Sequence, residues 1–115
     1  GLYAIEPFST SGSGSVKDSK PSGIYNITDE ERPVRDPFAR EVLKFIKEEY
    51  VTLPFCSRWI VKKFGTRALI ALKRIEDAGI THHYAQLVEA SKHKVAQAEH
   101  SILITDKEVI ITTKA

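Results

Sequence analysis

The first residues of the chain show the alternating pattern of a strand. A period of two over this apolar stretch places Leu2, Ala4, Glu6 and Phe8 on one face and Tyr3 and Ile5 on the other. Glu6 shares a face with apolar neighbours and is followed by Pro7, which cannot donate to a ladder, so we expect the strand to end here or to lie at a sheet edge. Because an unpaired buried carboxylate is costly, we also expect Glu6 to have a partner.

A helical pattern begins at Asp36, which is predicted to be an N-cap residue, with Pro37 at the first helical position. Apolar residues then recur three or four positions apart, which places them on one face of a helix. A short second helix is predicted over Ser57–Phe64. A third is predicted to run from a cap at Thr66 to Gly79.

Strand and turn patterns lie on either side of these helices. Ser9–Ser15 indicates a loop, and its Gly-x-Gly lacks the following helix that a phosphate-binding loop needs. Lys17–Arg35 is polar and turn-rich, with a short strand predicted over Gly23–Ile27. Further strands are predicted over Ile80–Val88, Val95–Thr105 and Glu108–Thr113.

The composition indicates the class of protein but does not indicate a binding partner. The 115 residues, 42% hydrophobic and 28% charged with a formal net charge of +2, are typical of one small soluble domain. The single cysteine, Cys56, excludes an internal disulfide framework, and no apolar run approaches the roughly 18 residues that span a bilayer. We therefore expect a cytoplasmic protein with no membrane contact. The absence of methionine, even at position 1, indicates a piece of a longer protein.

The order of helices, strand and turn is that of a winged-helix module, and its charges leave a nucleic-acid function open. Between Tyr50 and Ile75 every charged residue is positive. Lys62, Lys63 and Arg67 are the candidates for nucleic-acid contacts. Glutamates in the preceding helix argue against this function, and cationic side chains also serve simply as a solvated face.

A second glutamate interrupts an apolar strand near the end of the chain. Glu99 lies within Val95–Thr105, where the neighbouring residues are mostly Val, Ala, Ile and Leu. One such glutamate is usually a polar position that faces water. Two strand-borne glutamates, Glu6 and Glu99, favour a site for hard divalent cations, which prefer oxygen ligands on rigid supports.

Three segments together resemble a known family. "YAIEPF" at 3–8, "TLPFCSRW" at 52–59 and "AQAEHSILIT" at 96–105, in this order and at these intervals, resemble the C-terminal part of archaeal-type type II methionine aminopeptidases. The resemblance covers essentially the whole chain. It implies an α+β fold: antiparallel strands from the C-terminal portion of a pita-bread fold at 1–28 and 84–115, with a three-helix, winged-helix-like insertion at 29–83.

The resemblance also implies roles for individual residues. Family members hold two divalent metal ions (Co, Mn, Fe or Zn) and release N-terminal methionine from nascent polypeptides. Glu6 matches a metal-binding glutamate that can also hold the proton of the attacking water, and Glu99 matches the glutamate that bridges both ions. Tyr84 matches an aromatic residue of the methionine pocket. Ile24 falls where some relatives place a histidine, so a proton donor is missing there.

The other metal ligands of the family, two aspartates and a histidine, would precede Gly1. The resemblance therefore implies that the chain alone is inactive and needs the N-terminal half of the same enzyme as a partner. Contact with the ribosome is compatible with this function. Two alternatives stay open: a winged-helix module that binds nucleic acid or the ribosome, and a non-catalytic pita-bread interaction protein, against which the two retained glutamates argue.

Overall fold

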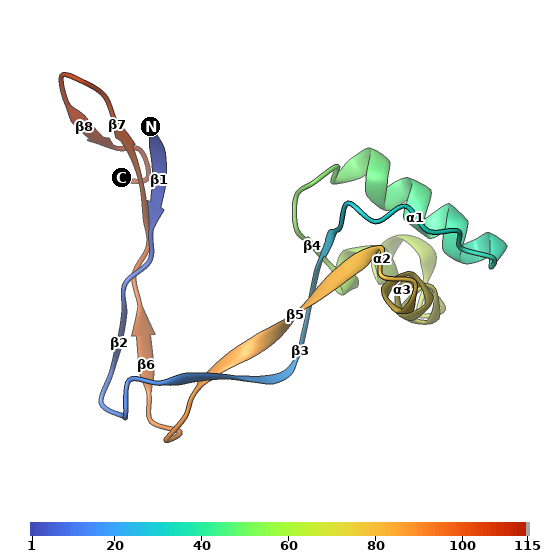
Figure 1. The fold of residues 1–115 in the computed structure, drawn as a ribbon, viewed down its shortest axis with the longest axis horizontal. Coiled ribbons are helices and arrows are strands. Elements are labelled where there is room, and N and C mark those ends of the chain that lie inside the picture. Colours follow the sequence, from blue (N-terminus) through green and yellow to red (C-terminus); the bar gives the residue numbers. More distant parts are fainter. Residues whose placement is uncertain (115) are drawn as a thin grey trace. The chain divides into compact units, whose positions relative to one another are not determined.

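The computed structural model describes residues 1–114, which form three helices and eight strands (Figure 1). The chain divides into two compact units, each described by itself below. Unit 1 comprises Gly1–Asp18 and the chain from Leu87 onward, and unit 2 comprises Ser19–Gln86. The α+β class predicted from the sequence is confirmed. Within residues 1–114, every helix is too short or too polar to span a lipid bilayer.

Unit 1 is built of short antiparallel strands. One sheet has the order β1-β7-β8 and a second pairs β2 with β6. Their bounds are β1 Leu2–Ile5, β2 Phe8–Thr10, β6 Val95–Gln97, β7 His100–Ile104 and β8 Val109–Ile111. The end of the first strand before Pro7 is confirmed.

The single strand predicted over Val95–Thr105 is wrong, because the ladder lapses at Ala98 and Glu99 between β6 and β7. The cause lies on the facing strand. Pro7 accepts a hydrogen bond from Ala98 N at 3.2 Å through its carbonyl oxygen, but it has no N–H with which to donate in return. The pairing therefore stops on both strands at the same place.

Unit 2 contains the helices and one three-stranded sheet of order β4-β3-β5. Their bounds are α1 Pro37–Glu49, α2 Ser57–Phe64, α3 Ala68–Asp77, β3 Val16–Ile27, β4 Phe55–Cys56 and β5 Thr81–Glu89. The first residues of β3 and the last residues of β5 belong to unit 1. The buried apolar core of residues 1–114 lies in this unit: Tyr25, Ala39, Val42, Ile46, Phe55, Ile60, Ala68, Ala71, Leu72, Ile75 and Ile80.

The predicted start of α1 is confirmed. Asp36 Oδ1 accepts a hydrogen bond from Ala39 N at 2.7 Å, and Pro37 occupies the first turn. The predicted cap at Thr66 is wrong. The helix α3 begins at Ala68 with no side-chain cap, because a tight turn supplies backbone acceptors: Ala68 N donates to Gly65 O at 3.0 Å, and Leu69 N to Thr66 O at 3.1 Å.

The turn-rich segment predicted over Lys17–Arg35 is wrong in its first third, where β3 runs continuously from Val16 to Ile27. Pro21 is tolerated in this strand because β4 pairs with it, among the described residues, at Ile24 and Tyr25 alone. Near Pro21 one edge of β3 is therefore unpaired within residues 1–114, so the backbone N–H that proline lacks is not needed there, as on an edge strand.

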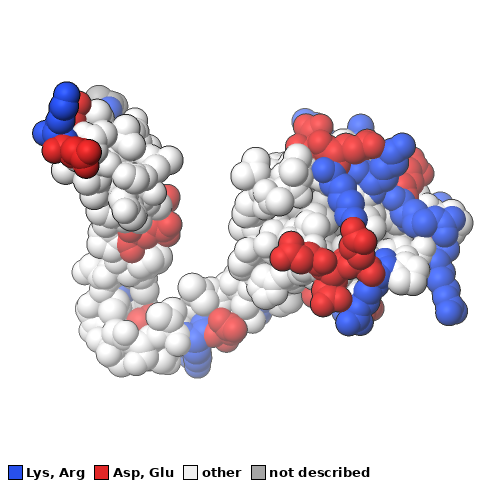
Figure 2. Space-filling model, turned by 45° about the horizontal axis from the view of Figure 1, so that its top comes forward, with Lys and Arg blue, Asp and Glu red and all other residues white. Residues whose placement is uncertain are grey.

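Unit 1 differs from unit 2 in having almost no interior. Among its described residues, Glu89 is the single buried one, and it is polar. Large apolar side chains on its strands are exposed, including Leu2, at 70% exposure, and Phe8, at 62%. Figure 2 shows that the surface of these strands is mostly uncharged. The strands of unit 1 therefore present apolar surface of the kind that usually contacts another protein segment.

Candidate active site

The two sheets of unit 1 share one continuous antiparallel register. Ile5 lies opposite His100 at the end of the β1–β7 ladder. Phe8 lies opposite Gln97 where the β2–β6 ladder begins. Two residues separate these pairs on each strand, so the register crosses the break without a slip.

This register places Glu6 opposite Glu99. Residues directly opposite in an antiparallel pair project to the same face. A hydrogen bond from Gln97 Nε2 to Glu6 Oε2, at 3.3 Å, agrees with this placement, because Gln97 lies two positions from Glu99 and hence on the same face. The structure thus brings together the two glutamates that the sequence singles out.

The electrostatics of this pair favour a cation. Like charges directly opposite each other destabilise an antiparallel pair, and a divalent ion bound between them removes the repulsion. Both side chains are exposed and so accessible to ligands. Within residues 1–114, no group of three or more His, Cys, Asp or Glu side chains gathers in a metal-binding arrangement. The chemistry of the donors therefore fits part of a metal site and leaves further ligands to be supplied.

The neighbouring histidine does not add to the pair. His100 follows Glu99 in the chain and so projects to the other face of the strand. Its Nδ1 lies 3.0 Å from Thr113 Oγ1 and is therefore engaged on that other face. In the described part of the chain the candidate centre therefore consists of carboxylates alone.

A cavity of about 220 Å³ lies beside the β2–β6 ladder within unit 1. Its lining includes Phe8, two positions beyond Glu6 on the same face, together with Val16, Leu87 and Val95. Glu89 is the one charged residue in the lining. Sequence reasoning missed this cavity, because its walls come from segments far apart in the chain.

Glu89 holds two loops of unit 1 together. Its Oε1 accepts hydrogen bonds from Ser13 N and Ser13 Oγ, both at 2.7 Å. Its Oε2 accepts from Ser91 Oγ at 2.6 Å and from His93 N at 3.2 Å. These bonds, first that from Ser91 and then that from Ser13, lower the pKa of Glu89 from 4.5 to about 2. A Cβ on Gly12 would lie 2.5 Å from the Glu89 carboxyl carbon, so a larger residue there would displace this carboxylate from its hydrogen bonds.

The two predicted substrate residues lie on neighbouring strands of unit 2. Ile24 is on β3, opposite Cys56 of β4, and Tyr84 is on β5. Their exposed fractions, 43% and 39%, leave both side chains able to contact a ligand. The His82 ring meets the Tyr84 ring edge-on, with the centroids 4.8 Å apart, and so limits the movement of Tyr84.

The three predicted nucleic-acid residues differ in their surroundings. Lys63 Nζ lies 4.4 Å from the centre of the Phe45 ring, and the Arg67 guanidinium lies 4.6 Å from that of Phe38. Such contacts stabilise the helices as well as leaving a positive charge at the surface. Lys62 is exposed. Within residues 1–114 none of the three forms a salt bridge with a carboxylate.

Comparison with known proteins tests the resemblance to methionine aminopeptidases. No protein-family model matches the chain. The methionine aminopeptidase of Methanocaldococcus jannaschii is 44% identical over 113 residues, which is 98% of this chain and 37% of that protein. The chain is homologous to methionine aminopeptidases. That of Archaeoglobus fulgidus is 40% identical over 113 residues, and methionine aminopeptidase 2 of Dictyostelium discoideum is 37% identical over 111.

The match covers only part of each methionine aminopeptidase. The chain spans 37% of the length of the two archaeal relatives and 26% of the Dictyostelium one. Among solved structures, that of a thermophilic Arx1 matches with a TM-score of 0.80 at 17% identity, over 96% of this chain and 29% of the other. At this identity the likeness shows the fold alone, and it supports the assignment to a portion of the pita-bread fold.

Proposed function

We propose that this chain is the C-terminal part of a methionine aminopeptidase, which removes N-terminal methionine from nascent polypeptides at a site for two divalent metal ions (Co, Mn, Fe or Zn). The observation that carries the proposal is the opposition of Glu6 and Glu99 in one antiparallel register. Homology to methionine aminopeptidases along 98% of the chain supports it.

The two glutamates would divide the work of the metal site. Two divalent ions, when bound, polarise the substrate carbonyl and lower the pKa of a coordinated water. Glu6 would hold one ion and also take up a proton as a general base. Glu99 has two carboxylate oxygens, one for each ion, so it suits a bridging position. Both lie where the ladder lapses, and both side chains are exposed and so open to ligands.

The substrate's methionine side chain would contact Tyr84 and Ile24. Both present apolar surface, which suits an unbranched thioether. Ile24 supplies no hydrogen-bond donor, so recognition there would rest on packing alone. We therefore expect little discrimination between methionine and an isosteric apolar residue such as norleucine.

Two carboxylates are fewer ligands than a two-metal site requires, so the remaining ligands must come from the N-terminal half of the same enzyme. The exposed apolar strands of unit 1 offer a surface for that half. On this proposal 1–28 and 84–115 belong to the catalytic strands, 29–83 is a winged-helix-like insertion, the chain alone is inactive, and the enzyme is cytoplasmic.

The test starts with the natural protein. Its intact mass is measured, and release of methionine from a Met-Ala-Ser peptide is followed with added divalent metal and, as a control, with a chelator. A mass near 12.9 kDa with activity only after addition of a separate N-terminal chain would indicate a split enzyme. A larger active protein would indicate that this sequence is one part of it. No activity in any form would contradict the proposal and favour a non-catalytic interaction protein.

A second function rests on a different observation: Lys62, Lys63 and Arg67 form no salt bridge with any carboxylate of residues 1–114. We propose as the alternative that the helices of unit 2 bind RNA, including that of the ribosome. Binding of a short RNA should then weaken steeply as salt is raised, and the triple change to glutamine should reduce the slope of log affinity against log salt. An unchanged slope would exclude these residues as phosphate contacts.

A further inference from the structure

The strand β3 contains a kink whose hydrogen bonds come from side chains. At Gly23 the backbone has a φ of 79°, in the left-handed region that favours glycine. Beyond it, Ile24 N donates to Ser22 Oγ at 3.0 Å. The same hydroxyl donates to the Tyr84 carbonyl oxygen on β5 at 2.6 Å. One hydroxyl therefore joins the backbones of Ile24 and Tyr84.

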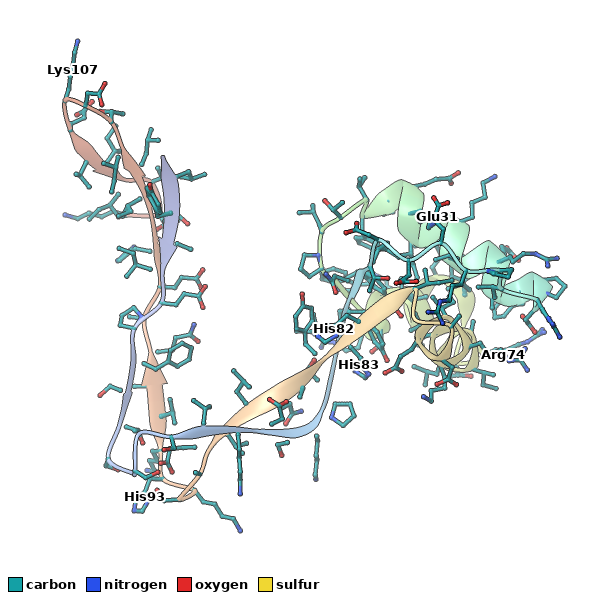
Figure 3. The ribbon with its side chains drawn as sticks, viewed as in Figure 1. Glu31, Arg74, His82, His83, His93 and Lys107 are labelled. Carbon is teal, nitrogen blue, oxygen red and sulfur yellow. The ribbon has the colours of Figure 1, made fainter. Side chains whose placement is uncertain are left out.

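A second side chain secures the kink from β5. Gly23 N donates to His83 Nε2 at 3.0 Å, which requires the proton of the neutral ring to be on Nδ1. That nitrogen lies 3.5 Å from Glu76 Oε1. The His83 ring, labelled on β5 in Figure 3, stacks on Tyr25 with the centroids 3.9 Å apart. His83 is thus held on both ring edges and one face, and it fixes the peptide between Ser22 and Gly23.

The kink has little freedom to shift. A Cβ on Gly23 would meet Ser57 Oγ at 3.0 Å, and an L side chain is strained at this φ. At Ile24, which lies opposite Cys56 of β4, the backbone N–H donates to the Ser22 hydroxyl. The Ser22 hydroxyl therefore links the Ile24 and Tyr84 backbones in addition to the pairing of β3 with β5.

We propose that Ser22 is a positioning residue for the methionine pocket. This rests on the proposed function, in which Ile24 and Tyr84 contact the substrate's first side chain. Ser22 touches neither substrate nor metal on this proposal. It sets the separation of the two residues that do, and so determines how closely they pack on methionine.

Removing the hydroxyl should weaken substrate binding more than turnover. In Ser22→Ala, Ile24 N and the Tyr84 carbonyl each lose a partner, and the two residues are free to move apart. The loss of one ordinary hydrogen bond corresponds to roughly a fivefold change in binding. We expect the KM for Met-Ala-Ser to rise about fivefold with kcat within twofold, because the contacts are equal in the ground and transition states. Ser22→Thr, which keeps the hydroxyl, should restore the original KM.

The experiment uses the complete natural enzyme with Ser22→Ala, Ser22→Thr and the control Ser19→Ala, an exposed serine of the same strand. Kinetics are measured below the melting temperature of every variant. If Ser22 had a purely structural role, Ser22→Ala would lower the active fraction of the enzyme, and so kcat, at unchanged KM. Either that result, or kinetics of Ser22→Ala equal to those of Ser19→Ala, would overturn the inference. Failure of the proposed function is distinguishable, because the unaltered enzyme would then release no methionine.

Discussion

Glu6 lies opposite Glu99 in a single antiparallel register, although the two residues come from nearly opposite ends of the chain. The relationship depends on the absence of a slip across the break at Pro7. A shift of one residue in either strand would turn one carboxylate to the other face. The two ladders on either side of the break, each with several fixed pairs, prevent that shift.

Glu99→Gln in the complete enzyme should abolish metal-dependent release of methionine, with a loss of at least about 100-fold, because an amide is neutral and cannot bridge two cations. Metal binding, measured by titration calorimetry, should weaken in parallel. Glu108→Gln makes the same change at another exposed glutamate of unit 1 and should have no effect. Equal activities of the two variants would exclude Glu99 as a ligand.

The loops joined by Glu89 should respond to acid. The pKa of this carboxyl is lowered from 4.5 to about 2 in the folded protein, so the unfolded state binds the proton first as pH falls. The carboxylate's contribution to stability is fully present above about 4.5 and is lost as pH falls through about 2. The Ser13 amide resonance of the folded protein, followed by NMR, should titrate with a midpoint near 2 and should not titrate near 4.5. In Glu89→Gln the Ser13 amide should exchange faster and show no such titration; an identical titration in that variant would contradict the assignment.

Truncation of the core of unit 2 should destabilise its helices. Ile75 on α3 is 0% exposed, so Ile75→Ala leaves a cavity and should lower the free energy of unfolding by about 2 to 5 kcal/mol. Leu69→Ala, at a position 52% exposed on the same helix, should change it by less than about 0.5 kcal/mol. Urea unfolding followed by circular dichroism measures both. Similar midpoints for the two variants would show that α3 is not packed as described.

Local chemistry and periodicity predicted much of this structure. The Asp36–Pro37 start of α1 was predictable because the N-cap hydrogen bond, from Ala39 N to the Asp36 side chain, lies within four consecutive residues. The common face of Glu6 and its apolar neighbours followed from the period of two. The family resemblance then linked Glu6 with Glu99, and the observed register agrees with that link.

What the sequence did not predict depends on partners distant in the chain. The carboxylate of Glu89 is held by Ser13, 76 residues away, and a serine-rich loop gives no sign of such a contact. The break between β6 and β7 is caused by Pro7, which lies on the other strand. In β3, the polar composition around Pro21 hid a strand whose pairing partner β5 lies beyond the three helices.

The strand β8 has a consequence for handling the protein. It forms one edge of its sheet, and its three residues, Val109, Ile110 and Ile111, are all exposed. An apolar edge with free backbone groups adds strands from other molecules, which leads to aggregation. The chain produced by itself should therefore precipitate as its concentration rises, and co-expression with the proposed N-terminal half should keep it in solution.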